Sequence, residues 1–438
     1  MTESREVFRY TSPGVHRAPP ALLPLLGKDK KEGDGGETKG GDGFEAAPPP
    51  LRGLAPVSRA RTVAQAKRDE RTDRPLAFDT VVLKVHSRCN LSCDYCYVYT
   101  SPDRSWARRP RVMEKPLMLT VADRLAEYAS RHGLDEVTVI LHGGEPLLAG
   151  RDRIGFLAGA VRAAFEGLAT TVHLVLQTNG TLLDVPVLRV LDRWGVTVGV
   201  SVDGGAAEHD RHRRYPSGRA SHDRVAAALD LLRSPAHRHL FGGLLCTVDL
   251  ENDPVTTYES LAEHEPPVLD FLLPHGTWEA PPPRLPSQGT PYADWLIAVF
   301  ERWWADSETR VRIRMFDSLF RLGRGGSSLR SDLGTAPVTC VIVETDGAIE
   351  VHDNLKIVYE GAGVTGRNVM RDGFDGGGPV HEKTCAACAR CPVFTICGGG
   401  TRAHRYRAVN GFDNPTVYCA DMRRLIEHVE RRVSAWVC

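Results

Sequence analysis

Three cysteines lie close together in the stretch KVHSRCNLSCDYCYVY at residues 84–99. Cys89, Cys93 and Cys96 have the spacing C-x3-C-x2-C and follow an apolar run of strand length. Three thiolates on one tight loop can hold three irons of a cubane iron–sulfur cluster and leave the fourth iron open for a substrate or cofactor. The alternative is a zinc site that takes a fourth ligand from elsewhere in the chain. The spacing alone leaves both interpretations open.

Glycine and polar residues recur where later apolar runs end. The strings are HGGEP at residues 142–146, QTNG at 177–180 and SVDG at 201–204, with Arg213 shortly after the last. Two adjacent glycines let the backbone approach a ligand closely, because neither carries a Cβ. The carboxyl ends of parallel strands meet at one edge of a sheet, and ligands bind there. We therefore expect these strings and the three cysteines to surround one site.

The apolar runs alternate with helical patterns from Phe78 onward, which predicts a parallel sheet wrapped by helices. Six such units indicate an α/β fold built on a partial (β/α)6 barrel, not a closed eight-fold barrel. The expected strands are Phe78–His86, Glu136–His142, Thr171–Gln177, Val196–Asp203, Leu240–Leu250 and Val268–Leu273. The expected helices are Leu117–Arg131, Ile154–Phe165, Val185–Trp194, His222–Leu232, Tyr292–Trp304 and Val311–Leu322.

A second group of cysteines lies in the C-terminal part of the chain, where the composition becomes rich in glycine. Several of these cysteines are separated by only two to five residues, a spacing that suits zinc and iron–sulfur clusters equally well. This region is predicted to be a separate cysteine-rich module. Its cysteines are Cys340, Cys385, Cys388, Cys391, Cys397 and Cys419.

Composition and charge exclude several classes of protein. The 438 residues carry a formal net charge of +0, which gives no global electrostatic reason to bind nucleic acid or an acidic membrane. No apolar run is long enough to span a bilayer, and the N-terminus lacks the order of a secretory signal. We therefore expect a cytoplasmic protein. In that reducing compartment, 11 cysteines are more often metal ligands or catalytic groups than disulfides.

The texture of the chain divides it into four parts. Residues 1–76 are rich in glycine, proline and charge, which predicts a disordered, low-complexity segment with one apolar patch, ALLPLLG. Residues 77–285 are the predicted barrel, and residues 286–330 are a helical connection. Residues 331–438 are the predicted cysteine-rich module.

Taken together, the strand-end motifs resemble those of the radical SAM superfamily. Tyr95 stands between the second and third cysteines, where that superfamily carries an aromatic residue. The resemblance implies a [4Fe–4S] cluster on Cys89, Cys93 and Cys96, with S-adenosylmethionine bound at the open iron and cleaved to a 5′-deoxyadenosyl radical. The residues that it implies for binding S-adenosylmethionine are Tyr95, Gly143, Gly144, Glu145, Gln177, Asn179, Ser201, Asp203 and Arg213.

The C-terminal cysteines resemble the SPASM extension of radical SAM peptide-modifying enzymes. The core pattern of that extension is C-x2-C-x5-C-x3-C followed by a distant cysteine. Cys388, Cys391 and Cys397 match its first three positions, and Cys419 matches the distant one. The resemblance therefore implies one complete auxiliary [4Fe–4S] cluster on these four residues.

The inner auxiliary cluster of the same extension has lost at least two of its usual ligands. Thr401 stands at the fourth core position, and His352 replaces the cysteine of the Gly-x4-Cys element. A second auxiliary cluster is either absent or held in an unconventional way. The residues that could hold it are Cys340, His352 and Cys385.

Several longer strings resemble the FxsB-type radical SAM/SPASM peptide maturases, over roughly Phe78 to the C-terminus. They include LLPHGTWEAPP at residues 272–282, CGGGTRAHRY at 397–406 and GFDNPTVYCADM at 411–422. The resemblance implies a ribosomally made precursor peptide as substrate and an electron donor such as flavodoxin or ferredoxin. The implied reaction forms a cyclophane, in which an aromatic carbon is joined to the Cβ of a residue two positions downstream.

Other functions stay open on the sequence alone. A related enzyme could form thioethers or oxidise a sulfatase serine or cysteine, and a more remote alternative is a metal-stabilised, non-catalytic peptide-binding module. Cyclophane formation also needs a proton acceptor, and no catalytic residue is assigned to that step. The candidates are His275, Asp346, Glu350, His352 and His404.

Overall fold

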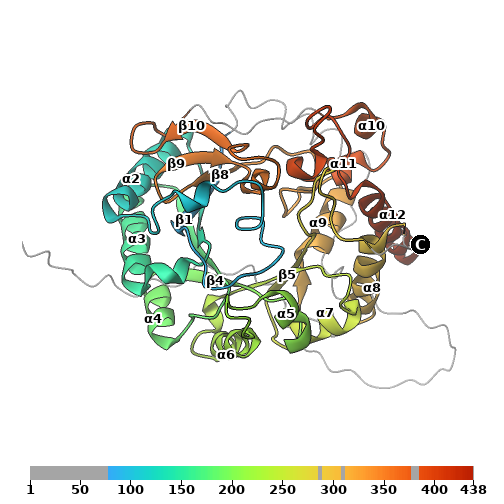
Figure 1. Cartoon of the computed structure of the whole chain (residues 1–438), viewed down its shortest axis with the longest axis horizontal. Coiled ribbons are helices and arrows are strands. Elements are labelled where there is room, and N and C mark those ends of the chain that lie inside the picture. The colour runs from blue at the N-terminus through green and yellow to red at the C-terminus, as the bar shows by residue number, and fades with distance from the viewer. Residues whose placement is uncertain (1–76, 285–288, 307–310, 376–383, 438) are drawn as a thin grey trace, which may run out of the picture. The chain divides into compact units, whose positions relative to one another are not determined.

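The computed structural model describes residues 77–284, 289–306, 311–375 and 384–437. The predicted segment 1–76, with its apolar patch, lies outside the described residues. The described strands form a ten-stranded sheet in the order β10-β9-β8-β1-β2-β3-β4-β5-β6-β7 (Figure 1). Their bounds are β1 Thr80–His86, β2 Glu136–Gly143, β3 Thr171–Thr178, β4 Val196–Ser201, β5 Phe241–Thr247, β6 Val268–Leu272, β7 Arg312–Ile313, β8 Cys340–Val343, β9 Ala348–Val351 and β10 Val364–Asn368.

Strands β1 to β6 are parallel to one another, and helices on the outer side connect them. Figure 1 shows α2, α3, α4 and α6 on the outside of the curved sheet. The helices are α2 Lys115–His132, α3 Arg151–Ala164, α4 Val185–Trp194, α5 Ala206–His212, α6 His222–Arg233, α7 Pro254–Ala262, α8 Pro291–Ala305, α9 Arg314–Gly323, α10 Ala386–Ala389, α11 Phe394–Cys397 and α12 Cys419–Val437. The α/β class and the partial barrel are confirmed.

Helix α4 illustrates how local sequence sets these boundaries. The Asp184 carboxylate accepts a hydrogen bond from the Val187 amide at 2.8 Å, and a proline occupies the first turn. The helix ends at Gly195, which adopts a left-handed conformation with φ of 60°. In β2 and β3, buried residues alternate with partly exposed ones, because one face of each strand packs under the helices.

The helix predicted over residues 311–322 begins with a strand instead. Arg312 and Ile313 form β7, which pairs with Val268 and Leu269 of β6. The Ile313 side chain is fully buried, so its burial favours the extended pairing over another turn of helix. Helix α9 starts only at Arg314. The sequence prediction also omitted α5, α7 and α12.

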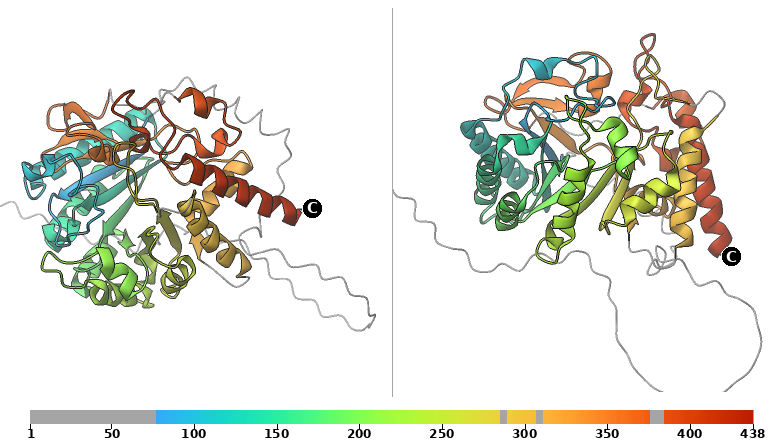
Figure 2. Two further views of the ribbon diagram at one scale, coloured as in Figure 1. Left: turned by 45° about the vertical axis from the view of Figure 1, so that its right-hand side comes forward. Right: turned by 60° about the horizontal axis from the view of Figure 1, so that its bottom comes forward.

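The cysteine-rich part of the chain continues the barrel sheet. Strand β8 pairs in parallel with β1, from Thr80 opposite Cys340 to Leu83 opposite Val343, and β9 and β10 extend this edge with antiparallel pairing. At the other end, α12 runs alongside α8 (Figure 2). His428 Nε2 lies 2.7 Å from Glu301 Oε1 across these two helices. Among the described helices, none is both long and apolar enough to cross a membrane.

Candidate active site

The carboxyl ends of the barrel strands surround a cavity of about 500 Å³, called the first cavity below. All three cysteines of the C-x3-C-x2-C loop line it. Most of the residues predicted to bind S-adenosylmethionine line this cavity as well, although they come from four strand ends and a helix terminus. These are Tyr95, Gly143, Gly144, Gln177, Asn179, Ser201 and Arg213.

The cysteine loop is held in a compact turn. The Cys96 amide donates a hydrogen bond to the Cys93 carbonyl at 3.2 Å, and the Leu91 amide lies 3.4 Å from Cys89 Sγ. Asn179, at the end of β3, places its Nδ2 3.7 Å from the same sulfur. Burial raises the pKa of Cys89 to about 12 and that of Cys93 to about 11. These sulfurs are therefore thiols without a metal, and a bound iron would displace their protons.

The glycine pair at the end of β2 lies directly beneath the cysteine loop. The Gly144 amide donates to the His86 carbonyl at 2.9 Å. A Cβ on Gly144 would lie 2.5 Å from the Arg88 carbonyl, and one on Gly143 would overlap the His86 carbonyl. Glycine is therefore required here for close packing of the backbone as well as for ligand approach.

The Glu145 carboxylate is absent from the cavity lining and points into the protein. It accepts hydrogen bonds from the Leu147 amide at 3.0 Å, the Asn179 amide at 2.8 Å and the Thr178 hydroxyl at 2.7 Å. The residue is fully buried. Burial raises its pKa to about 7, although the three hydrogen bonds act to lower it. This side chain joins the ends of β2 and β3, and it does not line the first cavity.

Asp203 is also buried behind the lining, where it orients Arg213. Asp203 Oδ2 accepts from Arg213 Nε at 2.7 Å and from the Tyr95 hydroxyl, while Oδ1 accepts from the Thr247 amide at 2.9 Å. The Arg213 guanidinium lies 5.5 Å from the centre of the Tyr95 ring. Its two terminal nitrogens make no hydrogen bond to the described residues. Arg213 can therefore offer a charged, planar pair of donors to a carboxylate in the cavity.

Two further polar residues of the lining, Gln177 and Asn179, are paired with neighbouring elements. Gln177 Nε2 donates to Ser201 Oγ at 2.9 Å, which links the ends of β3 and β4. Asn179 Nδ2 donates to Asn90 Oδ1 at 2.9 Å, which links β3 to the cysteine loop. These contacts fix the positions of donors and acceptors before any ligand binds.

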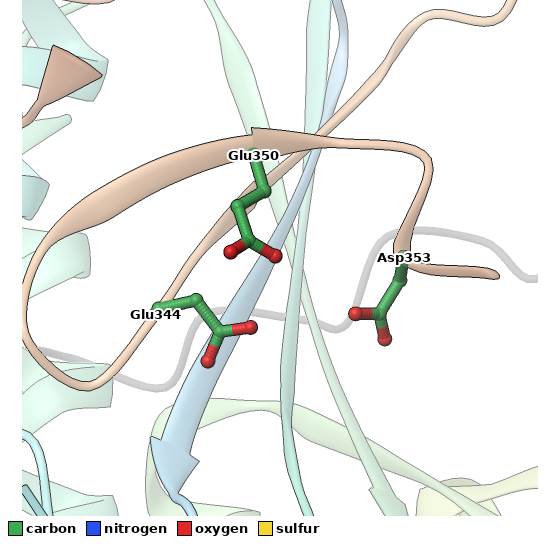
Figure 3. A group of neighbouring side chains, drawn as sticks. All are labelled: Glu344, Glu350 and Asp353. Carbon is green, nitrogen blue, oxygen red and sulfur yellow. The ribbon is translucent and has the colours of Figure 1, made fainter. Parts of the chain in front are cut away.

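A buried network of charges lies beside the first cavity (Figure 3). Figure 3 shows the carboxylates of Glu344, Glu350 and Asp353 pointing toward one another, close enough to hold a metal ion. Lys356 Nζ contacts all three, at 2.9, 2.8 and 2.6 Å respectively. Arg109 pairs with both glutamates. Lys84 also pairs with Asp353. Three cations, Lys356, Arg109 and Lys84, therefore balance the three carboxylates, so no metal ion is needed here.

Asp353 connects this network to the cysteine loop. It accepts from the Tyr97 hydroxyl at 2.6 Å and from Lys84 Nζ at 2.5 Å, and it lines the first cavity. Burial opposes its ionisation, but Lys356 and Lys84 outweigh burial and hold the pKa of Asp353 well below its usual range. The sequence prediction missed this residue and Tyr97. One signal was available, since Lys84 interrupts the apolar strand TVVLKVH.

Five of the C-terminal cysteines gather around α10 and α11. Burial raises the pKa of Cys388 to about 12, and a hydrogen bond with Cys385 and the nearby Cys419 and Cys397 thiols add to the effect. Burial and the nearby Cys391 and Cys385 thiols likewise raise the pKa of Cys419. Cys385 therefore lies with the four residues predicted to hold the auxiliary cluster.

The residues suggested for an inner cluster are placed differently. Cys340 and His352 line the first cavity together with Thr401. His352 adopts a left-handed backbone conformation with φ of 52°, which is uncommon for a residue other than glycine. Two of the three suggested ligands, Cys340 and His352, thus face the barrel cavity, whereas the third, Cys385, lies with the other C-terminal cysteines.

The candidate proton acceptors occupy contrasting surroundings. Glu350 is paired with Arg109 and Lys356 in the charge network. Asp346 is half-exposed, and its Oδ1 lies 3.5 Å from Arg109 Nη1. His275 lines the first cavity and packs edge-on against Tyr97, with ring centres 4.9 Å apart. His275 Nδ1 lies 2.9 Å from Nε2 of the buried His404. Of the candidates, His275 and His352 are the ones that face the first cavity.

Comparisons with known proteins agree with this site. The family model described as "Radical SAM superfamily" matches residues 83–244. The cysteine-type anaerobic sulfatase-maturating enzyme of Clostridium perfringens is 25% identical over 360 residues, which cover 79% of this chain and 95% of that enzyme. The serine-type enzyme of Klebsiella aerogenes is 24% identical over 366 residues, covering 77% and 82% respectively.

Solved structures share the fold. Native anSMEcpe with bound AdoMet and the Kp18Cys peptide superposes with a TM-score of 0.69 at 23% identity, covering 82% of this chain and 98% of that chain. Streptococcus suis SuiB bound to the precursor peptide SuiA gives a TM-score of 0.50 at 13% identity, covering 82% and 79%.

The matched segment contains the three-cysteine loop and the strand-end motifs that line the first cavity. Such a domain uses S-adenosylmethionine and a [4Fe–4S] cluster. The donor set fits both groups: three thiols suit three irons, and Arg213 suits a carboxylate. Residues 83–244 therefore form a radical SAM domain, and the chain is a radical SAM enzyme.

Proposed function

We propose that the enzyme modifies a ribosomally made precursor peptide by forming a three-residue cyclophane. A peptide substrate is supported by the likeness to enzymes whose names or structures include protein or peptide substrates. It is also supported by the first cavity, which extends beyond the cysteine loop. The cyclophane itself rests on the resemblance of the longer strings to FxsB-type maturases. Two of these strings, LLPHGTWEAPP at 272–282 and CGGGTRAHRY at 397–406, contribute residues to the lining of that cavity.

In this proposal, Cys89, Cys93 and Cys96 hold the [4Fe–4S] cluster. Arg213 binds the methionine carboxylate, and Glu145 and Asp203 act indirectly by orienting strand ends and Arg213. When bound, the cluster and S-adenosylmethionine supply a 5′-deoxyadenosyl radical that removes a hydrogen atom from an unactivated C–H bond. The residues expected to contact S-adenosylmethionine directly are Tyr95, Gly143, Gly144, Gln177, Asn179, Ser201 and Arg213.

The C-terminal cysteines are proposed to hold one auxiliary [4Fe–4S] cluster. Four thiols satisfy such a cluster completely, and Cys388, Cys391, Cys397 and Cys419 match the SPASM pattern. Closure of the cyclophane must remove one electron and one proton from the substrate to restore the aromatic ring. A low-potential centre in the same chain is a suitable electron acceptor, and a flavodoxin or ferredoxin would supply electrons to the barrel cluster.

A second candidate function is oxidation of a sulfatase serine or cysteine to an aldehyde. It is favoured by the coverage of the sulfatase-maturating relatives, which match nearly the whole described chain. The two reactions differ in product. Cyclophane formation removes two hydrogens from an aromatic-containing peptide and creates no aldehyde, whereas sulfatase maturation creates one.

The test is intact-mass analysis of a peptide encoded beside the gene, co-expressed with the enzyme and with its Cys89→Ala variant. We expect loss of two hydrogens per cross-link with the wild type and an unchanged mass with the variant. Tandem fragmentation should show that the bond joins a ring carbon to a Cβ. Thiol alkylation excludes a thioether, and a hydrazide reagent excludes an aldehyde. An unchanged peptide mass from protein with full iron content would count against this peptide as substrate.

A further inference from the structure

The end of α5 and the residues that follow it run alongside the cysteine loop. The Ser92 amide donates to the Arg214 carbonyl at 2.7 Å. His212 is the last residue of α5, and its ring packs edge-on against that of Tyr95, with ring centres 5.5 Å apart. Arg213, which is proposed to bind the methionine carboxylate, stands between these two contacts. This segment therefore touches the loop that carries the thiols and also supplies a cation to the first cavity.

The His212 ring lies between two carboxylates. Its Nδ1 lies 2.9 and 3.0 Å from the two carboxylate oxygens of Asp94, which stands between Cys93 and Tyr95 in the cysteine loop. Its Nε2 lies 3.1 Å from Oδ2 of Asp249, two residues beyond the end of β5. An ionised carboxylate can only accept, so both ring nitrogens must carry a proton to satisfy both contacts. The geometry therefore fits the imidazolium form and neither neutral tautomer.

The surrounding groups favour this charged form. A hydrogen bond to Asp249 and a second one to Asp94 raise the pKa of His212 to about 9, although burial opposes them. Burial also opposes the ionisation of Asp249, but hydrogen bonds from His212 and the Glu251 amide outweigh it and lower the pKa of that carboxyl. The other cation here is Arg211, whose Nε lies 3.3 Å from Asp249 Oδ2.

Exposure sets the expected size of the effect. The His212 side chain is 22% exposed and that of Asp249 is 16% exposed, so solvent screens this pair only in part. The Asp94 side chain is 66% exposed, so its contact with the ring contributes less. Loss of the imidazolium should therefore change binding at the site severalfold and leave the fold intact.

The position of His212 lets it act on Arg213 through the main chain. The helix ends at His212, and Arg213 leaves the helical conformation with φ of −92° and ψ of 73°. The Arg213 amide still donates to the His209 carbonyl at 3.0 Å. The direction in which the Arg213 side chain leaves is thus set where α5 ends, and the two carboxylates hold that end in place.

We infer that His212 is a positioning residue for S-adenosylmethionine, because its imidazolium joins Asp94 to Asp249 and so fixes the spacing between the cysteine loop and Arg213. His212 does not line the first cavity, so it acts through these neighbours. The methionine part of the cofactor must reach both the open iron and Arg213, and a fixed spacing lowers the cost of binding it. This inference rests on the cofactor site of the proposed function.

The test measures cofactor binding apart from turnover. Iron-loaded, full-length enzyme is dialysed anaerobically against labelled S-adenosylmethionine, over a range from about pH 7 to 10. The variants are His212→Gln, Asp94→Asn and the two combined, and iron analysis reports the cluster content of each. His239→Gln is the matched control, because His239 Nε2 lies 2.7 Å from the Asp192 carboxylate in another part of the protein. Amide hydrogen exchange at residues 88–99 of the iron-free protein reports the loop itself.

We expect His212→Gln to raise the dissociation constant about three- to tenfold near pH 7, because an uncharged amide cannot donate strongly to both carboxylates. Asp94→Asn should have a smaller effect, and the double variant should match His212→Gln, since paired residues are not additive. The wild-type constant should approach that of His212→Gln as the pH rises past about 9 and the imidazolium loses its proton. Exchange at residues 88–99 should accelerate severalfold in His212→Gln and not in His239→Gln.

Unchanged constants in His212→Gln and Asp94→Asn at full iron content would overturn the inference, as would identical pH profiles for the wild type and His212→Gln. If His212→Gln takes up no iron, Asp94→Asn decides the matter, because that exposed side chain can be replaced without disturbing the core. Arg213→Lys is measured alongside. A raised constant in Arg213→Lys alone would reject the role of His212 and keep the proposed cofactor site, whereas no change in either variant would reject both.

Discussion

The two cysteine groups of this enzyme differ in how the chain supports them. The Cys89–Cys96 loop is fastened to the neighbouring strand ends: the Glu145 amide donates to the Arg88 carbonyl at 3.0 Å, and the Asn179 side chain reaches Cys89. In the C-terminal group, Cys388 and Cys397 lie on two helices of four residues each, and the second helix is followed by three glycines in left-handed conformations at 398–400. Cys419 is the first residue of the long helix α12. One of its members, Cys419, is exposed.

This difference indicates two ways of holding a cluster. In the barrel, buried hydrogen bonds and the sheet keep the ligands in place, so the site is formed before iron binds. Around Cys388, Cys391 and Cys397, short helices and conformationally permissive glycines give little structure of their own, so we expect ligation to supply part of the folding free energy there. The comparison predicts that the two sites respond differently to mutation and to loss of iron.

The largest difference should appear when single cysteines are replaced. Cys89→Ala should abolish cleavage of S-adenosylmethionine, because the barrel cluster loses one of its three ligands. Cys388→Ala should leave measurable cleavage while abolishing peptide modification. Chromatography of 5′-deoxyadenosine and iron analysis check both variants. Full cleavage by Cys89→Ala would refute the assignment of the barrel cluster.

Removal of iron should destabilise the C-terminal cysteine region and leave the barrel site intact. After anaerobic chelation, amide hydrogen exchange at residues 384–400 should accelerate by at least about a hundredfold, since ligation no longer stabilises the turns. Exchange in β1 and β2 should change little. Mass spectrometry of exchanged peptides measures both regions in one sample. Equal acceleration in β1 and β2 would show that the barrel site also depends on its metal for folding.

Arg213 offers a sharper test of the preformed barrel site. Arg213→Lys should raise the dissociation constant for S-adenosylmethionine about ten- to a hundredfold, because lysine cannot present two coplanar donors while bonding Asp203. Arg214→Lys, on the same loop but exposed, is the control. Equilibrium dialysis with labelled S-adenosylmethionine gives both values. An unchanged constant for Arg213→Lys would remove this residue from the binding site.

The sequence predicted which strand ends line the first cavity, because the relevant information is local. Each strand end carries its own glycine or polar signature, and parallel strands bring those ends together whatever the details of packing. The charge network could not be predicted in this way. Tyr97 and Asp353 are 256 residues apart, and β8 joins β1 from a distant part of the chain. The orientation of the Glu145 and Asp203 side chains was also hidden, since a motif names residues without showing which way their side chains point.

Glu145 makes the preformed site sensitive to pH. Its pKa is raised by burial from 4.5 to about 7 in the folded chain. The folded state therefore binds the proton more tightly, and the stability that this contributes is present below pH 4.5 and lost as the pH rises through 7. Between pH 5 and 8, wild-type stability should fall by on the order of 2–3 kcal/mol more than that of Glu145→Gln.

Anaerobic urea unfolding at several pH values measures this difference in slope. Glu166→Gln is the control, because Glu166 is exposed and should retain the wild-type slope. Parallel profiles for wild type and Glu145→Gln would mean that Glu145 is not buried as an isolated carboxyl group.

The smallest effect concerns the fifth thiol of the C-terminal group. Cys385 is buried and hydrogen-bonded to Cys388, whereas Cys419 is exposed. The SPASM spacing nevertheless selects Cys419 as the ligand. Because four ligands complete a cubane, Cys385→Ala should leave the iron content unchanged, while Cys419→Ala should lower it by about four atoms per chain. Iron analysis and electron paramagnetic resonance of both variants decide between them. The reverse result would make Cys385 the fourth ligand, and the auxiliary cluster would then lie deeper in the protein.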